Sequence, residues 1–444
     1  MTFKLKEWRL YFFIAAFVMA CVALPFSKMV SQAGIILLIA IWLTEGNWSK
    51  KLQIVKGNLF LVCILLFYML NVIGVLYSED KQTAYGNLER YFPIVFVPLI
   101  FGTTDTRIPP ESLRMMISSF VVAVVCSTLV CLTSAFINYQ NGAQLLGLGT
   151  PEFDMLHVDI SNSAWLAFSY TDLTSALSIH PGFLALYVCF AMIVLHHWSN
   201  NLATGKKAQW LCWGAIAYLT TFLLLLSARI MLVTFALLAI VYILKTFNSR
   251  KAEALKLIGV LMLAVFLLMA NPVTWYRTFQ EMFISEYAVE HNNHYTNSTE
   301  IRLSLWWLAG SSLNANNVML GNGTGDTRLT MHETASRLNI SNVLNTHDPH
   351  NQFLFTLLAN GLIGLALISV ILFFPLLIAL NLNDVLLSGF CILFISLCLT
   401  ESALELQKGI GFFSLFGSLL LYRINGFEVI SAYTQFSKLK AILR

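Results

Sequence analysis

Charged residues are scarce in this chain. Only 11% of its 444 residues are Asp, Glu, Lys or Arg, whereas about 25% is usual for a soluble domain. Hydrophobic residues make up 57% of the chain and the mean hydropathy is +0.72. This composition excludes a globular protein that exposes its whole surface to water.

Two further absences narrow the class of protein. The chain has no Lys/Arg-rich tract with interleaved aromatic residues, and its net charge is only +4, so nothing indicates a nucleic-acid partner. All eight cysteines lie inside apolar runs. Neither a disulfide framework nor a Cys-x-x-Cys metal site is therefore expected.

Long apolar runs recur along the whole chain. A run of about 17–25 residues can cross a hydrocarbon core as a helix. The sequence predicts an all-α polytopic membrane protein with about twelve transmembrane helices. The runs lie near residues 10–26, 29–44, 59–77, 90–104, 113–137, 181–197, 208–226, 229–245, 255–270, 353–380, 384–400 and 409–422.

The loop charges give an orientation. Placing both termini in the cytoplasm puts most of the 27 Lys and Arg residues on the inner side, as the positive-inside rule requires. Two long loops, near residues 138–180 and 271–352, then fall on the outer side. The predicted organisation is a first helical region (1–270), a large outer loop with short helices (271–352) and a final helical region with a cytoplasmic tail (353–444).

The two outer loops differ in composition. The first contains no Lys or Arg and carries four acidic residues, Glu152, Asp154, Asp159 and Asp172, to which we assign no role. The second is rich in Asn and His, and its residues 301–313 show apolar positions at helical spacing. We expect this stretch to be a helix.

Arg229 stands where two apolar runs meet with almost no loop between them, two residues after Ser227. An arginine at membrane depth costs about 2.5–3.5 kcal/mol on insertion scales, so it should face a polar cavity or a partner. One interpretation is an arginine that reaches the outer interface at a hairpin turn. The functional interpretation is a contact to an anionic substrate.

Arg302 opens the amphipathic stretch of the second loop, next to Glu300. Arg302 could form a salt bridge with Glu300 or lie on a solvated face of the helix. The functional interpretation is that it binds an anion. Guanidinium groups match phosphate oxygens in pairs. Arg229 and Arg302 on the same side of the membrane therefore predict a clamp for a pyrophosphate group.

Two histidines, His347 and His350, lie where the second loop re-enters the apolar region, with Asp348 and Asn351 beside them. Imidazole is a suitable general base near neutral pH, and Asp348 or Asn351 could orient it. The alternatives are a metal site formed by His347 and His350, or ordinary interfacial histidines that cap the next helix.

Other polar residues are consistent with a cavity on this side. His180 precedes the sixth run, and residues 321–326 form a glycine-rich turn that either offers backbone N–H groups to an anion or is a flexible turn; it lacks the remainder of a P-loop. Glu401 and Glu405 could pair with Lys408 or with an arginine of the site.

The order of these motifs resembles the O-antigen ligase family, whose superfamily includes bacterial polysaccharide polymerases. The resemblance covers residues from about 180 to 420. It rests on a Ser-x-Arg, an Arg-x-x-x-Trp helix, a Gly-x-Gly turn, a His-Asn pair and a Gly-x-x-Gly span. The residues concerned are Ser227, Arg229, Arg302, Trp306, Gly321, Gly323, His350, Asn351, Gly361 and Gly364.

The resemblance implies a fold similar to GT-C glycosyltransferases and an inverting transfer that needs no metal or other cofactor. The expected reaction moves a glycan from undecaprenyl pyrophosphate to an acceptor sugar, lipid A core for a ligase, at the periplasmic face of the inner membrane. By this analogy Arg229 and Arg302 hold the donor pyrophosphate and His350 serves the acceptor hydroxyl or helps bind the phosphate. His347 and Asn351 would support them, and the predicted substrate-binding residues also include Ser227 and His180.

Two alternatives stay open at this stage. A polysaccharide polymerase of the same superfamily has the same motifs. A transporter or flippase would need ionisable residues near the bilayer midplane, whereas the runs keep nearly all charges at their ends.

Overall fold

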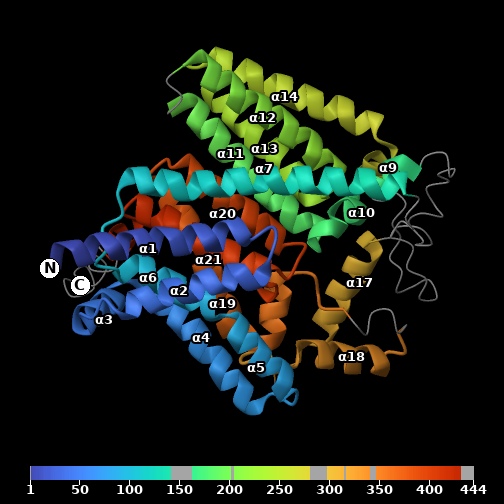
Figure 1. Cartoon of the computed structure of the whole chain (residues 1–444). Helices are drawn as coiled ribbons and strands as arrows, with labels where there is room; N and C mark the ends of the chain where they lie inside the picture. Colours follow the sequence, from blue (N-terminus) through green and yellow to red (C-terminus); the bar gives the residue numbers. More distant parts are fainter. Residues whose placement is uncertain are drawn as a thin grey trace. The chain divides into compact units, whose positions relative to one another are not determined.

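The computed structural model describes residues 2–141, 163–201, 205–280, 298–314, 317–340 and 347–431. In these ranges every regular element is a helix, and the helices are joined by turns and short connections (Figure 1). The predicted all-α class is confirmed. Of the acidic residues in the first long loop, Asp172 lies in helix α10, while Glu152, Asp154 and Asp159 lie outside the described ranges.

Each predicted apolar run coincides with a helix. These helices are α1 (Thr2–Ala23), α2 (Lys28–Leu43), α4 (Leu59–Tyr77), α6 (Phe92–Thr103), α7 (Pro110–Gln140), α11 (Pro181–Asn201), α12 (Lys206–Leu225), α13 (Arg229–Thr246), α14 (Lys251–Ala270), α19 (Gln352–Asn381), α20 (Val385–Cys398) and α21 (Gln407–Arg423).

Shorter helices lie between them. They are α3 (Trp48–Gly57), α5 (Lys81–Arg90), α9 (Ser163–Ala167), α10 (Tyr170–Thr174), η2 (Ser175–Leu177), α15 (Pro272–Trp275), η3 (Tyr276–Gln280), α17 (Ser298–Ser311), α18 (Thr327–Arg337) and η6 (Ala403–Glu405). Helix α17 confirms the helical stretch expected at residues 301–313.

Fewer of these helices have the length and hydropathy of a membrane span than the sequence predicts. Among the described residues, seven helices are long and apolar enough to cross a membrane: α4, α7, α11, α12, α13, α14 and α19. The pair α2 and α3, bent by 113°, makes up to eight. The predicted count of about twelve is not confirmed, because α6, α20 and α21 have 12, 14 and 17 residues and α1 begins with charged residues.

The chain divides into two compact units. Unit 1 comprises Met1–Phe120, Ser304–Cys391 and Cys398–Arg444, and unit 2 comprises Val121–Leu303 and Ile392–Leu397. In unit 1, α1 packs on α2, α6 on α21, and α4 on α19. In unit 2, α11 packs on α12 and α13, and α14 packs on α12 and α13.

Each unit has one helix that is buried on nearly all sides. In unit 1, residues 409–421 of α21 are all buried, and the rings of Phe412 and Phe416 pack against Phe120 with centroids 5.7 and 4.5 Å apart. In unit 2, residues 181–192 of α11 are all buried. A helix that is apolar all round suits such a central position.

Helix α19 is broken at Gly361, where the backbone takes a left-handed φ of 64°. The break would leave carbonyl groups without partners, but the glycine-rich turn supplies them: Asn322 N donates to Leu358 O (2.8 Å) and Gly323 N to Ala359 O (3.0 Å). A Cβ atom on Gly361 would lie 2.2 Å from Met319 O. Irregular backbone at membrane depth is tolerated where protein satisfies it in this way.

Candidate functional site

Arg229 begins α13 directly after the tight turn that follows α12. Its guanidinium is partly buried and donates two hydrogen bonds to hydroxyl groups, Nη1 to Thr299 Oγ1 (2.7 Å) and Nη2 to Ser298 Oγ (2.6 Å). Both acceptors belong to the first turn of α17. The side chain is therefore directed at a polar segment of unit 2, as an arginine in an apolar setting requires.

Arg302 lies on the same helix, one turn after Ser298 and Thr299, and is also partly buried. Residues three and four apart are neighbours on a helix surface. The first turns of α17 thus bring the two predicted arginines into one neighbourhood, with Thr299 and Ser298 as the shared element. Both belong to unit 2.

Ser227 fixes the turn that presents Arg229. Its backbone has a left-handed φ of 49°, and its side chain is 1% exposed. Its hydroxyl hydrogen-bonds the Thr274 hydroxyl (2.9 Å), and Thr274 also donates to Leu224 O (2.9 Å). These bonds tie the end of α12 to α15. The arrangement gives Ser227 a role in positioning Arg229.

A third arginine of unit 2, Arg277, was not among the predicted site residues. It follows α15, is 4% exposed, and its guanidinium carbon lies 3.6 Å from the centre of the Tyr170 ring. The His180 ring meets Tyr170 edge-on at 6.2 Å. His180 is itself exposed, and its Nδ1 accepts a hydrogen bond from Gly182 N (3.3 Å).

His350 lies in unit 1, in the turn that precedes α19, with a left-handed φ of 45°. Its backbone N–H donates to Asp348 Oδ1 (2.9 Å), which holds this turn. Its ring Nδ1 lies 3.2 Å from Glu401 Oε2 and 3.9 Å from Asp348 Oδ1. The His347 ring is 6.0 Å away, centre to centre. The imidazole therefore has carboxylates at one nitrogen.

Glu401 contacts His350, although the sequence analysis did not predict this pair. It follows α20 and is 6% exposed. A buried carboxylate at Nδ1 fixes the tautomer and orientation of an imidazole, leaving Nε2 as the other nitrogen. Asp348 is held in turn by Ser402 Oγ (3.1 Å) and by an ion pair with Arg328 (3.6 Å).

Asn351 anchors the His350 turn to the fold. Its side-chain oxygen caps α19 by accepting hydrogen bonds from Phe353 N (2.9 Å) and Leu354 N (3.1 Å). Its amide nitrogen donates to Leu399 O at the end of α20 (3.0 Å). The amide is thus engaged in joining the start of α19 to the segment that carries Glu401.

A buried carboxyl group, that of Glu405, contacts Gln352 at the start of α19. Glu405 accepts hydrogen bonds from Tyr91 and from Gln352 Nε2 (3.3 Å), and Arg90 Nη1 lies 3.8 Å from Oε2. Gln352 also accepts from Leu404 N (2.7 Å). Burial outweighs these contacts and raises the pKa of Glu405 to about 7, because desolvation favours the neutral form.

This raised pKa predicts a pH-dependent stability. The folded-state pKa lies above the ordinary value of 4.5. The contribution of Glu405 to the free energy of unfolding is therefore fully present below pH 4.5 and is lost as the pH rises through about 7. The shift corresponds to about 3 kcal/mol. We expect Glu405→Gln to remove this pH dependence. In thermal unfolding experiments in detergent, the stability of the wild type relative to that of the variant should therefore fall between pH 4.5 and pH 7.

Glu89→Gln is the matched control, because Glu89 is an exposed carboxylate of the same unit. A difference between wild type and Glu405→Gln that stays constant from below pH 4.5 to above pH 7 would contradict the prediction.

Residues 214–369 match the family model described as O-Antigen ligase. No curated protein matches the chain. The matched range contains six of the predicted site residues and leaves His180 and the newly found Glu401 outside. The six are Ser227, Arg229, Arg302, His347, His350 and Asn351.

Proposed function

Because residues 214–369 match the O-antigen ligase family model, we propose that this protein transfers a glycan from undecaprenyl pyrophosphate to an acceptor sugar, lipid A core in the ligase reaction. The long apolar helices and the family match both support a multi-pass membrane protein that transfers glycans. In our proposal it lies in the bacterial inner membrane, with both termini in the cytoplasm and its chemistry at the periplasmic face.

Arg229 and Arg302 are proposed to bind the donor diphosphate. As the glycosidic bond breaks, negative charge grows on the leaving phosphate oxygen, and fixed positive groups stabilise that charge more than they stabilise the ground state. The two hydrogen bonds from Arg229 to Thr299 and Ser298 support the proposal. These bonds hold the guanidinium of Arg229 next to helix α17, which carries Arg302.

His350 is proposed to receive the proton of the acceptor hydroxyl. The hydroxyl oxygen forms the new bond to the anomeric carbon while that carbon loses its bond to the diphosphate, which leaves with the electron pair. One displacement inverts the anomeric configuration. The Nδ1 contact to Glu401 (3.2 Å) supports this role, because a carboxylate there stabilises the imidazolium that forms.

The observation that carries the proposal is that the family match spans Arg229, Arg302 and His350 together. The test is a transfer assay with purified protein, a glycan on undecaprenyl pyrophosphate and lipid A core as acceptor. We expect lipid A core that carries the glycan, formed equally well with a chelator present. Loss of transfer on chelation would contradict the metal-independent mechanism and favour a metal at His347 and His350.

Two other products would change the assignment. Longer glycan on undecaprenyl pyrophosphate, with none on lipid A core, would identify the polymerase of the same superfamily. Flux of lipid-linked glycan across reconstituted vesicles without any new glycosidic bond would identify a transporter or flippase.

A further inference from the structure

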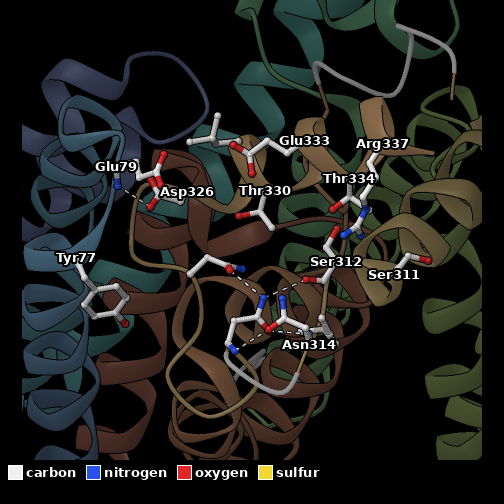
Figure 2. Close-up of a pocket in the computed structure, with 14 residues that line it drawn as sticks. Tyr77, Glu79, Ser311, Ser312, Asn314, Asp326, Thr330, Glu333, Thr334 and Arg337 are labelled. Carbon is white, nitrogen blue, oxygen red and sulfur yellow. Dashed lines mark hydrogen bonds between the residues drawn. The ribbon is translucent and has the colours of Figure 1, made fainter. Parts of the chain in front are cut away.

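Unit 1 contains a cavity of about 440 Å³ that is lined by none of the candidate site residues described above (Figure 2). Its walls come from α18, from the end of α17, from the segment that joins these two helices, and from the end of α4 with the residues that follow it. The volume lies within the range of small-ligand pockets, about 300–1,000 Å³. Most such pockets are lined mainly by apolar side chains, whereas this one is lined mainly by hydroxyl, amide and charged groups.

Helix α18 supplies the side chains that are available to a ligand. Thr330, Glu333, Thr334 and Arg337 follow one another at helical spacing and line the cavity. Figure 2 shows Thr330 below Glu333, with Asp326 on one side and Arg337 on the other. Within the described part of the chain, none of these four side chains takes part in a hydrogen bond or ion pair. Thr334 is nonetheless only 5% exposed.

The other polar groups of the cavity mostly serve the fold. Both carboxylate oxygens of Asp326 accept backbone N–H groups, from Glu79 (2.7 Å) and Asp80 (2.9 Å). The amide of Asn317 donates to Ser312 O (3.1 Å) and to Asn322 Oδ1 (2.9 Å). These bonds hold this part of the wall in place. The side chains of α18 are therefore the ones that can form hydrogen bonds with a ligand.

The charges of the lining argue against an anionic occupant. Glu79, Asp326 and Glu333 contribute carboxylates, and Arg337 is the single cation among the lining residues. A diphosphate would meet a net negative wall. A sugar ring suits it, because each sugar hydroxyl can donate to a carboxylate and accept from a guanidinium or a hydroxyl group. The Tyr77 ring, held by its hydroxyl on Leu320 O (2.7 Å), adds an apolar surface.

We propose that this cavity is a carbohydrate subsite that binds a neutral, hydroxyl-rich sugar ring through Glu333, Thr334 and Arg337. The inference rests on the proposed function, in which both substrates are glycans. The sugar belongs either to the acceptor or to the donor glycan. The two sources share the chemistry that this lining recognises.

The test uses the full chain in lipid nanodiscs and two probes, lipid-free core oligosaccharide and lipid-free O-antigen repeat unit. We expect calorimetry or saturation-transfer NMR to detect binding of one probe, which identifies the source. Glu333→Gln and Thr334→Val should each weaken that binding about tenfold, as the loss of one hydrogen bond to a charged or buried group does. The same variants should raise the KM for the matching substrate and leave kcat near wild type.

The controls are Ser336→Ala, on the same helix but outside the cavity, and Glu89→Gln, an exposed carboxylate of unit 1. Both should bind and transfer as wild type does. The proposed subsite would be overturned if the wild type bound neither probe. It would also be overturned if both Glu333→Gln and Thr334→Val bound the probe as tightly as the wild type while transfer proceeded. If the variants lose sugar binding but the wild type transfers no glycan, the subsite stands and the proposed function fails.

Discussion

Replacing Arg302 with alanine should lower the rate of glycan transfer by about 10²–10³-fold, the usual cost of removing one group that stabilises developing negative charge. Arg229→Ala should have an effect of the same order. In both variants we expect kcat to fall more than KM rises, because the lost contact is strongest in the transition state. The measurement is single-turnover transfer from the lipid-linked donor.

Arg229→Lys sharpens this prediction. Lysine keeps the positive charge but cannot form two bonds in the fork geometry, which Arg229 uses toward Thr299 and Ser298. We expect activity between that of wild type and that of Arg229→Ala. Arg114→Ala, which removes an exposed arginine, is the control for net charge and should transfer normally. Normal transfer by Arg302→Ala and Arg229→Ala, with donor binding intact, would remove both residues from the donor site.

The sequence was sufficient to predict the helices but not the number of membrane spans. Every apolar run became a helix because backbone groups in an apolar setting must pair within the segment. The composition of a run does not say whether it is long enough to cross. Helix α6, for example, has 12 residues and Pro98 inside, and α21 is buried along residues 409–421 by its neighbours.

The candidate site was predicted in part. Local sequence identified Arg229, because an arginine between two apolar runs is conspicuous, but the hydroxyl groups it binds lie 69 and 70 residues away. Similarly, Glu401 contacts His350 across 51 residues, and no local pattern joins them. The Gly-x-Gly turn was seen as a motif, while its partner, the broken helix at Gly361, is revealed only by tertiary hydrogen bonds.

The contact between His350 and Glu401 predicts a non-additive pair. We expect His350→Ala to lower kcat by about 10²–10⁴-fold, the usual contribution of a positioned general base. Glu401→Gln should lower it less, because glutamine keeps an oxygen near Nδ1 but removes the negative charge. Steady-state transfer at saturating donor and acceptor measures both effects.

The double variant separates positioning from a structural role. If Glu401 acts through His350, then adding Glu401→Gln to His350→Ala should lower kcat no further, since residues that act as a unit are not additive. Glu428→Gln, a carboxylate in the described part of unit 1 outside this contact, should be silent in either background. An equal fractional loss from Glu401→Gln with and without His350 would show that the carboxylate acts independently of the imidazole, and the proposed role of Glu401 would fall.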